Sequence, residues 1–354
     1  MTRTAETPPT FFAPVDTSPA VQLVRLVQGY EVTQIVATVA RLGLADRLVE
    51  QPKSSAELAE ATGADPEGLA RLLRAAATVG LVTELEADHF ELTPVGACLA
   101  ADAQPASLRD FAVALASPGQ WLPCGRLFDA VMSGHPSTAL ALGTEIWDYY
   151  RNNPEEGAVF ARAMGGLSAS VSTEVAAHYN AARFTRIVDV GGSQGTLLAG
   201  LLKAAPQATG VLFDRPEVIA EARPVITARG LAERMELVSG DFFTEVPAGG
   251  DLYVLKSVLH DWNDTDVLRI LANCHRAAQP GSMLLLVEGL KPTEPGPSPI
   301  HLINLLMFIQ VKGRERTREE HQALLEAAGY RLERVLTPST GLYHPWSLLE
   351  ARRI

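Results

Sequence analysis

The chain has 354 residues, a net charge of −11, an isoelectric point near 5.3, and hydrophobic side chains at 47% of its positions. This length predicts about two domains, and the hydrophobic content is ample for packed cores. An acidic surface repels phosphate backbones, which argues against nucleic-acid binding. Because Cys98, Cys124 and Cys274 form no C-x-x-C pair and leave an odd count, we expect reduced thiols and a cytoplasmic protein.

We expect neither a signal peptide nor a membrane span, from the N-terminal segment and from the most apolar stretch of the chain. Residues 1–17 begin with polar residues and two adjacent prolines and contain no long apolar run, which predicts a disordered tail. The most apolar stretch, 300–311, is too short to span a bilayer and carries His301, Asn304 and Gln310. We therefore expect no membrane association.

Residues 18–105 are expected to form one small domain. Apolar residues at helical spacing over 18–50 predict two helices, and capping residues predict two more helices near 55–62 and 66–79. Two short strands are expected at 81–86 and 89–93. Helices followed by a small hairpin are typical of a winged helix.

A winged helix often binds DNA through its second helix. Here that helix carries only Arg71 and Arg74, beside Asp65 and Glu67, whereas a DNA reader shows a basic stripe. The pattern therefore favours a packing or dimerisation module, and the surplus of apolar residues in the early helices predicts a homodimer. A winged-helix regulator with a ligand-sensing domain is the alternative outside the enzymes.

The segment 106–180 is expected to be a helical connector that also supplies pocket helices. Prolines predict its breaks: Pro118, Pro123, Pro136 and Pro154. The last part, 154–179, is expected to form one long helix with Phe160, Met164 and Leu167 near one side. Such a stripe usually packs in a core, and it lines a ligand site only if it faces one.

From residue 181 to the C-terminus, apolar strands alternate with helices. The expected strands are 186–190, 211–213, 235–239, 252–255, 283–287, 331–337 and 346–351. This alternation predicts an α/β fold, a Rossmann-like and mostly parallel seven-stranded sheet with helices on both faces. Ligands of such sheets bind at the carboxyl ends of the strands.

A glycine-rich turn, V-D-V-G-G-S-Q-G, follows the first of these strands. Gly191 and Gly192 would let the backbone approach a ligand without a Cβ in the way. Asp214 ends the next strand, where a carboxylate can accept both hydroxyls of a ribose. A glycine turn followed by such an acid predicts a cofactor that contains a nucleoside, with a nicotinamide dinucleotide as the competitor. The turn lacks the G-x-G-x-x-G spacing of dinucleotide sites.

Two further features stand at strand ends. Asp241 follows the third strand, after Asp189 and Asp214, and it could accept an adenine amino group that the neighbouring phenylalanines cover. Each acid alone is more often a helix cap. His260 follows the fourth strand, and Glu288 and Glu315 would fix its tautomer and raise its pKa if both meet it.

The order of motifs V-D-V-G-G, F-D-x-P-x-V, G-D-F-F, L-K-x-x-L-H-D-W and G-x-E-R-T resembles the S-adenosylmethionine-dependent O-methyltransferases of the caffeic-acid-methyltransferase-like class. The resemblance spans nearly the whole chain, and the H-D-W element with the later E-R-T loop is its specific part. It implies methyl transfer to a hydroxyl, phenolic by preference, of an aromatic or polyketide-type natural product. It also implies pairing through the N-terminal domain and no metal.

The resemblance assigns roles to individual positions. It implies that the cofactor is bound by Gly191, Gly192, Asp214, Asp241, Phe242, Lys256 and, more weakly, Ser168. It implies that His260 is the general base, oriented by Glu288 and Glu315. The acceptor pocket is expected to include Phe160, Met164, Asn304 and Met307.

Three departures from the family pattern bear on specificity. Ser193 replaces the middle glycine of the turn, Glu156 replaces an aromatic pocket residue of plant relatives, and the stretch from Met307 to Glu315 is one residue shorter. The last two leave the acceptor open. An N-methyltransferase, and an enzyme that uses the cofactor to decarboxylate or hydroxylate an aromatic polyketide, are the alternatives within the fold.

Overall fold

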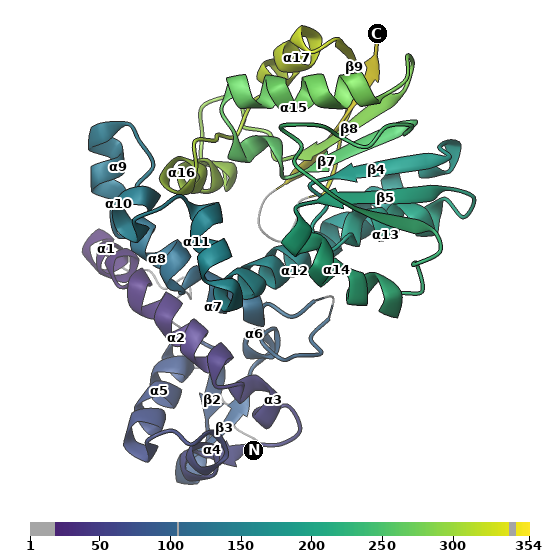
Figure 1. Ribbon diagram of the computed structural model, residues 1–354. Coiled ribbons are helices and arrows are strands. Elements are labelled where there is room, and N and C mark those ends of the chain that lie inside the picture. The colour runs from purple at the N-terminus through teal and green to yellow at the C-terminus, as the bar shows by residue number, and fades with distance from the viewer. Residues whose placement is uncertain (1–17, 105, 340–344) are drawn as a thin grey trace, which may run out of the picture. The chain divides into compact units, whose positions relative to one another are not determined.

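The computed structural model describes residues 18–104, 106–339 and 345–354, so the predicted tail over 1–17 lies outside the described residues. The chain divides into two compact units (Figure 1). The first comprises Met1–Trp121 and Ala158–Gly166, and the second comprises Leu122–Gly157 and Leu167–Ile354. The domain boundaries expected from the sequence, after residues 17, 105 and 180, remain a prediction.

The first unit combines helices with a small antiparallel sheet of order β1-β3-β2. Its elements up to residue 97 are α1 Pro19–Val27, α2 Gly29–Arg41, α3 Leu44–Leu48, β1 Lys53–Ser54, α4 Ser55–Thr62, α5 Pro66–Thr78, β2 Val82–Glu84, the 3-10 turn η1 Glu86–Asp88, β3 His89–Leu92 and α6 Pro94–Ala97. Ser54 caps α4 by a reciprocal bond pair with Glu57, and Asp65 accepts the Gly68 N–H at 2.7 Å to cap α5. The two expected helices and the hairpin are therefore present.

Two features of the first unit differ from the expectations. Residues 18–50 form three helices rather than two, because Gly43 adopts a left-handed conformation (φ 61°) that ends α2 and begins α3. The two-residue strand β1 was not expected, since so short a strand has no readable alternation, and it pairs with β3. Leu58 of α4, Leu73 of α5 and Phe90 of β3 pack together in the buried core of this unit.

The connecting segment is helical, as expected: α7 Arg109–Leu115, α8 Pro118–Cys124, α9 Leu127–Ser133, α10 Thr138–Leu142, α11 Ile146–Asn152 and α12 Pro154–His178. Pro118 and Pro154 each begin a helix, where a missing N–H costs nothing. The break expected at Pro123 is wrong, because this proline lies inside α8, one residue before its end. There it removes at most one hydrogen bond.

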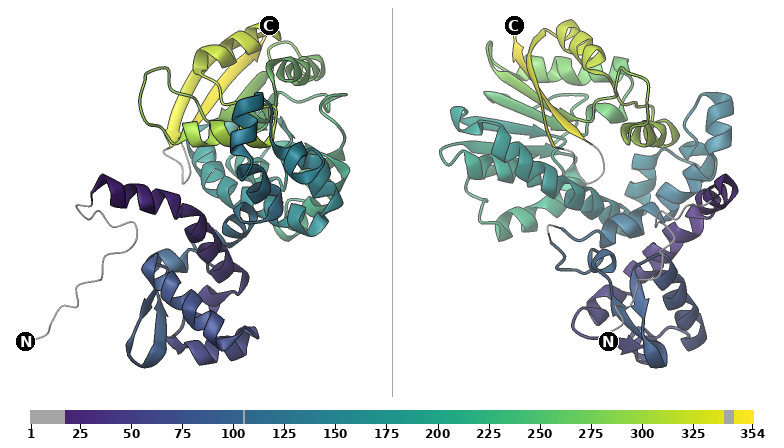
Figure 2. Two further views of the ribbon diagram at one scale, coloured as in Figure 1. Left: turned by 90° about the vertical axis from the view of Figure 1, so that its left-hand side faces the viewer. Right: turned by 180° about the vertical axis from the view of Figure 1, so that it is seen from behind.

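The second unit contains a seven-stranded sheet of order β6-β5-β4-β7-β8-β10-β9. The strands are β4 Arg186–Val190, β5 Thr209–Asp214, β6 Met235–Ser239, β7 Leu252–Lys256, β8 Met283–Glu288, β9 Tyr330–Ser339 and β10 Trp346–Arg353. The first five are parallel, and β10 is antiparallel to both β8 and β9. Figure 2 shows β9 and β10, in yellow, as long neighbouring strands at one edge. The fold class predicted from the sequence is confirmed.

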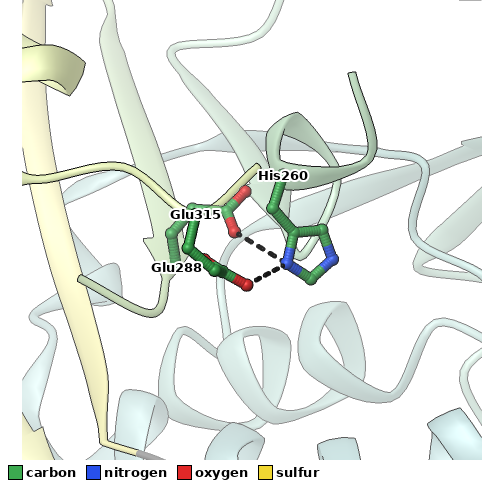
Figure 3. A group of neighbouring side chains, drawn as sticks. All are labelled: His260, Glu288 and Glu315. Carbon is green, nitrogen blue, oxygen red and sulfur yellow. Dashed lines mark hydrogen bonds and ion pairs between the residues drawn. The ribbon is translucent and has the colours of Figure 1, made fainter. Parts of the chain in front are cut away.

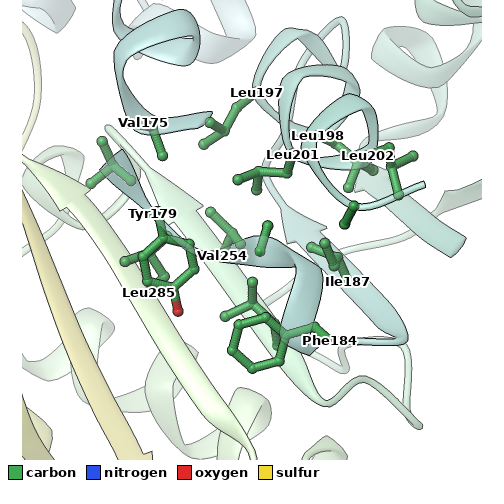
Figure 4. Close-up of a cluster of buried hydrophobic side chains, with 14 of the residues drawn as sticks. Val175, Tyr179, Phe184, Ile187, Leu197, Leu198, Leu201, Leu202, Val254 and Leu285 are labelled. Atoms are coloured by element: carbon green, nitrogen blue, oxygen red, sulfur yellow. The ribbon is translucent and has the colours of Figure 1, made fainter. Parts of the chain in front are cut away.

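Helices cover both faces of this sheet. On one face, α12 packs with α13 Thr196–Ala204 and α14 Pro216–Ala228 in a cluster that includes Leu198, Leu201, Val254 and Leu285 (Figure 4). On the other face lie α15 Asp264–Ala277 and α17 Arg318–Ala327. Because both faces are buried, the central strands are apolar almost throughout.

The remaining elements of the second unit are α16 Ile300–Gln310 and two 3-10 turns, η2 Ala181–Arg183 and η3 Leu259–Asp261. The turn η3 carries the candidate histidine. None of the helices in the described ranges is long and apolar enough to cross a membrane. The cytoplasmic location remains a prediction.

Candidate functional site

The order in which strands are added to the sheet reverses at β4, which is the topological switch point. From β4 it adds β5 and then β6 on one side, and it returns to place β7 on the other side of β4. In a parallel sheet the crevice at such a switch point, outside the carboxyl ends of the strands, is the usual ligand site. Gly191, Asp214, Lys256 and Glu288 all end or directly follow parallel strands at this edge.

The conformation of the turn after β4 requires glycine at specific positions. Gly191, Ser193 and Gly195 have φ values of 72°, 53° and 69°, in the left-handed region that glycine adopts without strain. A Cβ on Gly192 would lie 2.5 Å from the Leu212 side chain and 2.6 Å from the Asp189 carboxylate. Packing within the protein therefore already requires glycine at 192, in addition to any ligand approach expected from the sequence.

Asp214 is held by the glycine turn. Its Oδ2 accepts the Ser193 N–H and its Oδ1 accepts the Arg215 N–H, each at 2.8 Å. Burial raises the pKa of this carboxyl, and the two backbone N–H groups oppose that effect. Each carboxylate oxygen has a second lone pair, so Asp214 can accept two ribose hydroxyls while keeping both backbone bonds.

The three acids of the sequence pattern do not occupy equivalent places. Asp189 lies within β4, 1% exposed, paired in register with Leu212, whereas Asp214 is the last residue of β5 and Asp241 follows the end of β6. Burial raises the pKa of Asp189 to about 7, opposed by the charge of Lys256. Asp241 is exposed, and its Oδ1 accepts the Phe243 N–H at 2.9 Å. Two acids, not three, are thus available at the crevice.

Three aromatic rings, two from the segment after β6 and one from the segment after β7, contact one another. Phe242 and Phe243 contact edge to face at 4.9 Å between centroids, and Trp262 of the H-D-W element meets both, at 6.0 and 4.6 Å. A Cβ on Gly191 would lie 3.7 Å from the Phe242 ring. The glycine turn, the expected adenine cover and the H-D-W element are therefore neighbours.

His260 lies on η3 and meets both predicted glutamates (Figure 3). Its Nδ1 is 2.8 Å from Glu315 Oε1 and 3.9 Å from Glu288 Oε2. The two glutamate side chains are 1% and 0% exposed, and that of His260 is 14% exposed. Glu288 is itself held, because its Oε1 accepts the N–H groups of Val258 and Leu259 at 3.2 and 3.0 Å.

Asp261 was not assigned a role from the sequence, although it adjoins His260. Its Oδ1 lies 3.6 Å from Nε2, the ring nitrogen opposite to Glu315. Burial on its own lowers the pKa of His260, but the charges of Glu315, Asp261 and Glu288 outweigh it and raise the pKa to about 10. Burial raises the pKa of Glu288 to about 7 and that of Asp261 to about 6. The cluster therefore retains a proton on the imidazole.

Lys256 and Asn304 have partners that the sequence did not reveal. Lys256 Nζ donates to Ser257 Oγ at 3.2 Å and lies 5.1 Å from the Trp346 ring centroid. Burial lowers the pKa of this amine. Asn304, expected to line the acceptor pocket, accepts the Glu315 N–H at 2.8 Å through its Oδ1. It therefore supports a member of the histidine cluster, whether or not it also contacts an acceptor.

The other predicted residues lie on two helices. Met307 is partly buried on α16, one turn after Asn304. Ser168 is on the part of α12 that belongs to the second unit, whereas Phe160 and Met164 are on the part that belongs to the first. Their roles toward cofactor and acceptor remain predictions.

The histidine cluster also meets a distance criterion for a metal site. One ligand atom from each of His260, Glu288 and Glu315 lies within 4.8 Å of the others. The short bond from His260 Nδ1 to Glu315, and the two N–H donors to Glu288, describe a hydrogen-bonded set. The expectation that the protein needs no metal remains a prediction.

Comparison with known proteins identifies two family domains. Residues 125–331 match a family described as O-methyltransferase domain, and residues 24–102 match one described as O-methyltransferase dimerisation domain. The chain is 39% identical to the mitomycin biosynthesis 6-O-methyltransferase of Streptomyces lavendulae, over 93% of each chain. It is 35% identical to the 8-amino-8-demethylriboflavin N,N-dimethyltransferase of Streptomyces davaonensis, over 91% of this chain and 92% of that one.

Solved structures agree with these matches. The crystal structure of LaPhzM aligns with a TM-score of 0.91 and 36% identity, covering 96% of this chain and all of that one (100%). The neocarzinostatin-biosynthesis O-methyltransferase NcsB1, in complex with S-adenosylmethionine and 2-hydroxy-5-methyl naphthoic acid, aligns with a TM-score of 0.78 and 30% identity, covering 91% and 96%. The chain therefore belongs to the S-adenosylmethionine-dependent O-methyltransferases, with an N-terminal dimerisation domain.

Proposed function

We propose that this enzyme transfers a methyl group from S-adenosylmethionine to a phenolic hydroxyl of a small aromatic or polyketide-type natural product, with His260 as the general base. The observation that carries the proposal is the asymmetric placement of the His260 ring. Its Nδ1 is engaged by buried Glu315 at 2.8 Å, while Nε2 lies on the opposite side of the ring, beside the less buried Asp261. Glu315 thus selects the tautomer in which Nε2 can accept a proton.

Several residues fit a nucleoside at the glycine turn. Asp214 keeps lone pairs for a ribose, and Phe242 lies beside Gly191 where it can cover an adenine, with Asp241 as the acceptor for its amino group. Gly191, Gly192, Lys256 and Ser168 complete the set that the family resemblance assigns to the cofactor. When bound, S-adenosylmethionine supplies a methyl group on a positively charged sulfur, whose leaving group is neutral and needs no acid.

The acceptor is the part that needs activation, because a phenol has a pKa of about 10 and is mostly neutral at pH 7. A positioned base contributes about 10²- to 10⁴-fold to the rate, and alignment of the reacting groups can contribute about 7–11 kcal/mol. His260 would supply the first effect. Phe160, Met164, Asn304 and Met307 would supply the second by holding the aromatic ring.

The raised pKa of His260 constrains this mechanism. With a pKa of about 10 the ring is protonated near neutral pH, and a protonated imidazole cannot accept a proton. A positive charge close to His260 disfavours its charged form and lowers this pKa. We infer that His260 becomes an effective base only with the cationic donor in place, so that proton removal is tied to a loaded site.

Product analysis with isotope-labelled S-adenosylmethionine and a panel of phenols tests the proposal. We expect methyl ethers as products, no dependence on a metal chelator, and a loss of turnover of about 10²- to 10⁴-fold in His260→Ala, with the affinity for S-adenosylhomocysteine, whose sulfur is neutral, nearly unchanged. As a matched control, His275→Ala removes a partly buried histidine of α15 whose ring contacts Tyr330 and not the candidate site, and it should keep full turnover. Equal turnover in His260→Ala and wild type would refute the base role and leave methylation by proximity alone.

Nitrogen methylation is the second candidate, because one relative of similar identity is named as an N,N-dimethyltransferase. Amines have an accessible lone pair once neutral and need less help from a base. Matched acceptors that differ only in a hydroxyl or an amino group separate the two candidates. Turnover of the amine alone, insensitive to His260→Ala, would favour nitrogen.

We also propose that the enzyme is a homodimer paired through its N-terminal domain. The matched dimerisation family covers residues 24–102, and Leu23, Leu26 and Val27 of α1 are exposed although apolar. Arg71 and Arg74 of α5 are paired with acidic residues of the same unit, which supports the expectation of no nucleic-acid binding. A solution mass near a single chain would contradict the dimer.

A further inference from the structure

The candidate base is assembled from three stretches of chain that are far apart in sequence. His260 lies on the turn 259–264, Glu288 ends β8, and Glu315 lies in the loop 313–317. The relative position of these stretches decides whether the 2.8 Å bond between His260 and Glu315 exists. Arg316, next to Glu315, is the residue that touches all three.

The side chain of Arg316 is 0% exposed, and each of its five N–H groups has an acceptor. Nη1 donates to the Leu259 carbonyl at 2.9 Å and to the Arg314 carbonyl at 3.3 Å. Nη2 donates to the Trp262 carbonyl at 2.7 Å and to Asp264 Oδ1 at 2.7 Å, and Nε donates to the same oxygen at 3.0 Å. The guanidinium therefore binds the turn immediately before and shortly after His260.

The backbone of Arg316 makes the link to the third stretch. Its carbonyl accepts the Lys291 N–H at 2.9 Å, and it forms a parallel bridge with Leu290, two residues after Glu288. On the other side of the loop, a Cβ on Gly313 would lie 1.8 Å from the His260 carbonyl oxygen. The loop thus lies directly against the histidine turn on one side and the end of β8 on the other.

We propose that Arg316 is a positioning residue for the base: its guanidinium holds the turn that carries His260 in register with Glu315 and Glu288. This inference rests on the proposed function, since it acts through His260. Only a planar group with five donors can reach these carbonyls and Asp264 at once, whereas a lysine offers three donors from one point. A shift of about 1 Å between reacting groups can lower a rate by about 10²-fold.

The alternative is that Arg316 only stabilises the fold, as many buried ion pairs do. The two roles differ in how Arg316 and His260 combine. If Arg316 acts by placing His260, its replacement costs turnover only while His260 is present, so the two substitutions are not additive. A contribution to the fold alone would lower the residual turnover of His260→Ala as well.

The test compares Arg316→Lys with Arg314→Lys, a matched substitution in the same loop. Arg314 also contacts the Asp264 side chain, but it is 40% exposed and, unlike Arg316, it donates to neither the Leu259 nor the Trp262 carbonyl of the histidine turn. We expect Arg316→Lys to lower kcat by about 10²-fold with the donor KM unchanged, and Arg314→Lys to stay within about twofold. In the His260→Ala background, Arg316→Lys should change kcat by less than about threefold. Calorimetric binding of S-adenosylhomocysteine verifies that each variant is folded.

Two results would overturn the inference: full turnover in Arg316→Lys, or an equal loss with and without His260. Full turnover in His260→Ala would instead refute the base role and this inference with it, so the two failures are distinguishable. If Arg316→Lys does not fold, Asp264→Asn removes the charge that anchors Arg316 from a side chain that is 47% exposed. It should lower kcat less than the arginine variant, again only with His260 present, and an unchanged kcat would count against the proposal.

Discussion

The candidate site has two halves that are built by different means. In the donor half, formed by the turn Gly191–Gly195 with Asp214, Asp241 and Phe242, backbone N–H groups hold the key carboxylate. In the base half, formed by His260, Glu288 and Glu315, the key bond joins two side chains that are 55 residues apart in the chain. The donor half is local and backbone-determined, whereas the base half depends on tertiary packing.

The two halves also differ in the number of charged groups that they bring together. In the donor half one partly buried carboxylate, Asp214, is stabilised mainly by two backbone N–H groups, while the base half places several carboxylates around one imidazole. Substitutions in the donor half should therefore change donor affinity with little effect of pH. Substitutions in the base half should change turnover and its pH dependence.

The largest effect on donor affinity is expected for Asp214→Ala. Loss of two charge-assisted hydrogen bonds to a ribose, at about 1.5–3 kcal/mol each, should weaken donor binding by at least about 10²-fold. The kcat at saturating donor should stay close to that of the wild type, because the base half is intact. Calorimetric titration with S-adenosylhomocysteine measures the affinity.

Asp251→Ala is the matched control for Asp214→Ala. Asp251 also accepts backbone N–H groups, those of Thr185 and Arg186, but at the opposite end of the sheet. It should lower stability and leave donor affinity unchanged. A donor affinity that is equal in Asp214→Ala and wild type would remove the ribose role and break the division into two halves.

The next effect is a shift in pH dependence on Glu315→Gln. The Glu315 charge helps to raise the pKa of His260 to about 10, so its removal lowers that pKa. In the wild type, kcat/KM should rise with pH from about pH 6 to about pH 10 as the free-enzyme ring loses its proton. In Glu315→Gln the rise should occur at lower pH, with a lower plateau because the ring is no longer held.

Glu320→Gln is the control for this profile. Glu320, in the first turn of α17, accepts a hydrogen bond from Arg314 at 2.6 Å. Burial on its own raises the pKa of Glu320, but Arg314 and the Thr317 N–H outweigh it and lower the pKa to about 2. The profile of this variant should match that of the wild type. An unshifted profile in Glu315→Gln would mean that the rise comes from the acceptor phenol rather than from His260.

The two halves also differ in how far the sequence predicts them. The strands that support the donor half, its glycine turn and Asp214 are recognisable because they follow one another within about one βαβ unit. His260, Glu288 and Glu315 were named through the resemblance, and the structure brings them together. Their meeting cannot follow from spacing alone, since it depends on how β7, β8 and the loop before α17 pack.

What the sequence did not reveal is mostly the support around the site. The Asn304 bond to the Glu315 N–H and the five bonds of Arg316 connect residues by three-dimensional packing and leave no local pattern. Asp189 was grouped with the strand-end acids because it precedes the glycines, although it lies in a strand. Alternation cannot separate a buried acid from an exposed one in a strand covered on both faces.

A smaller effect, on stability, is expected for Asp189→Asn. Burial raises the pKa of Asp189 to about 7, above the value of about 3.9 in an unfolded chain. The folded state therefore keeps a proton that the unfolded state loses, and stability falls as the pH rises from about 4 to about 7. Asparagine carries no charge, so the variant should gain about 1–3 kcal/mol of unfolding free energy at about pH 8 and nothing below about pH 4.

Urea unfolding at both pH values, without donor, measures this difference. The opposite change in unfolding free energy is expected for Lys256→Met. This substitution removes the positive charge that stabilises the ionised Asp189 carboxylate, so the variant should be less stable than the wild type at about pH 8. A loss of stability in Asp189→Asn at high pH would show that the attraction between the charges of Asp189 and Lys256 outweighs the cost of burial.

The smallest effects are expected at two serines with backbone in the left-handed region, Ser193 three residues after β4 and Ser257 directly after β7. Ser193 has a φ of 53° and Ser257 a φ of 52°, a conformation that costs a residue with a Cβ about 1 kcal/mol. Glycine removes this strain but adds freedom to the unfolded chain. In the donor half Ser193 bonds Asp214 through its backbone N–H, so Ser193→Gly keeps that bond and should be slightly more stable, by less than about 1 kcal/mol.

Ser257 directly precedes the strand-end segment that carries His260 of the base half, and its hydroxyl accepts from Lys256 at 3.2 Å, so Ser257→Gly loses a partner of a partly buried amine as it relieves the strain. We expect it to be no more stable than the wild type. Urea unfolding measures the change in unfolding free energy for each variant, one at a turn bonded through its backbone and one at a turn bonded through a side chain. An equal gain in both would mean that the serine hydroxyl contributes nothing to the base half, and that its order comes from Arg316 and the glutamates alone.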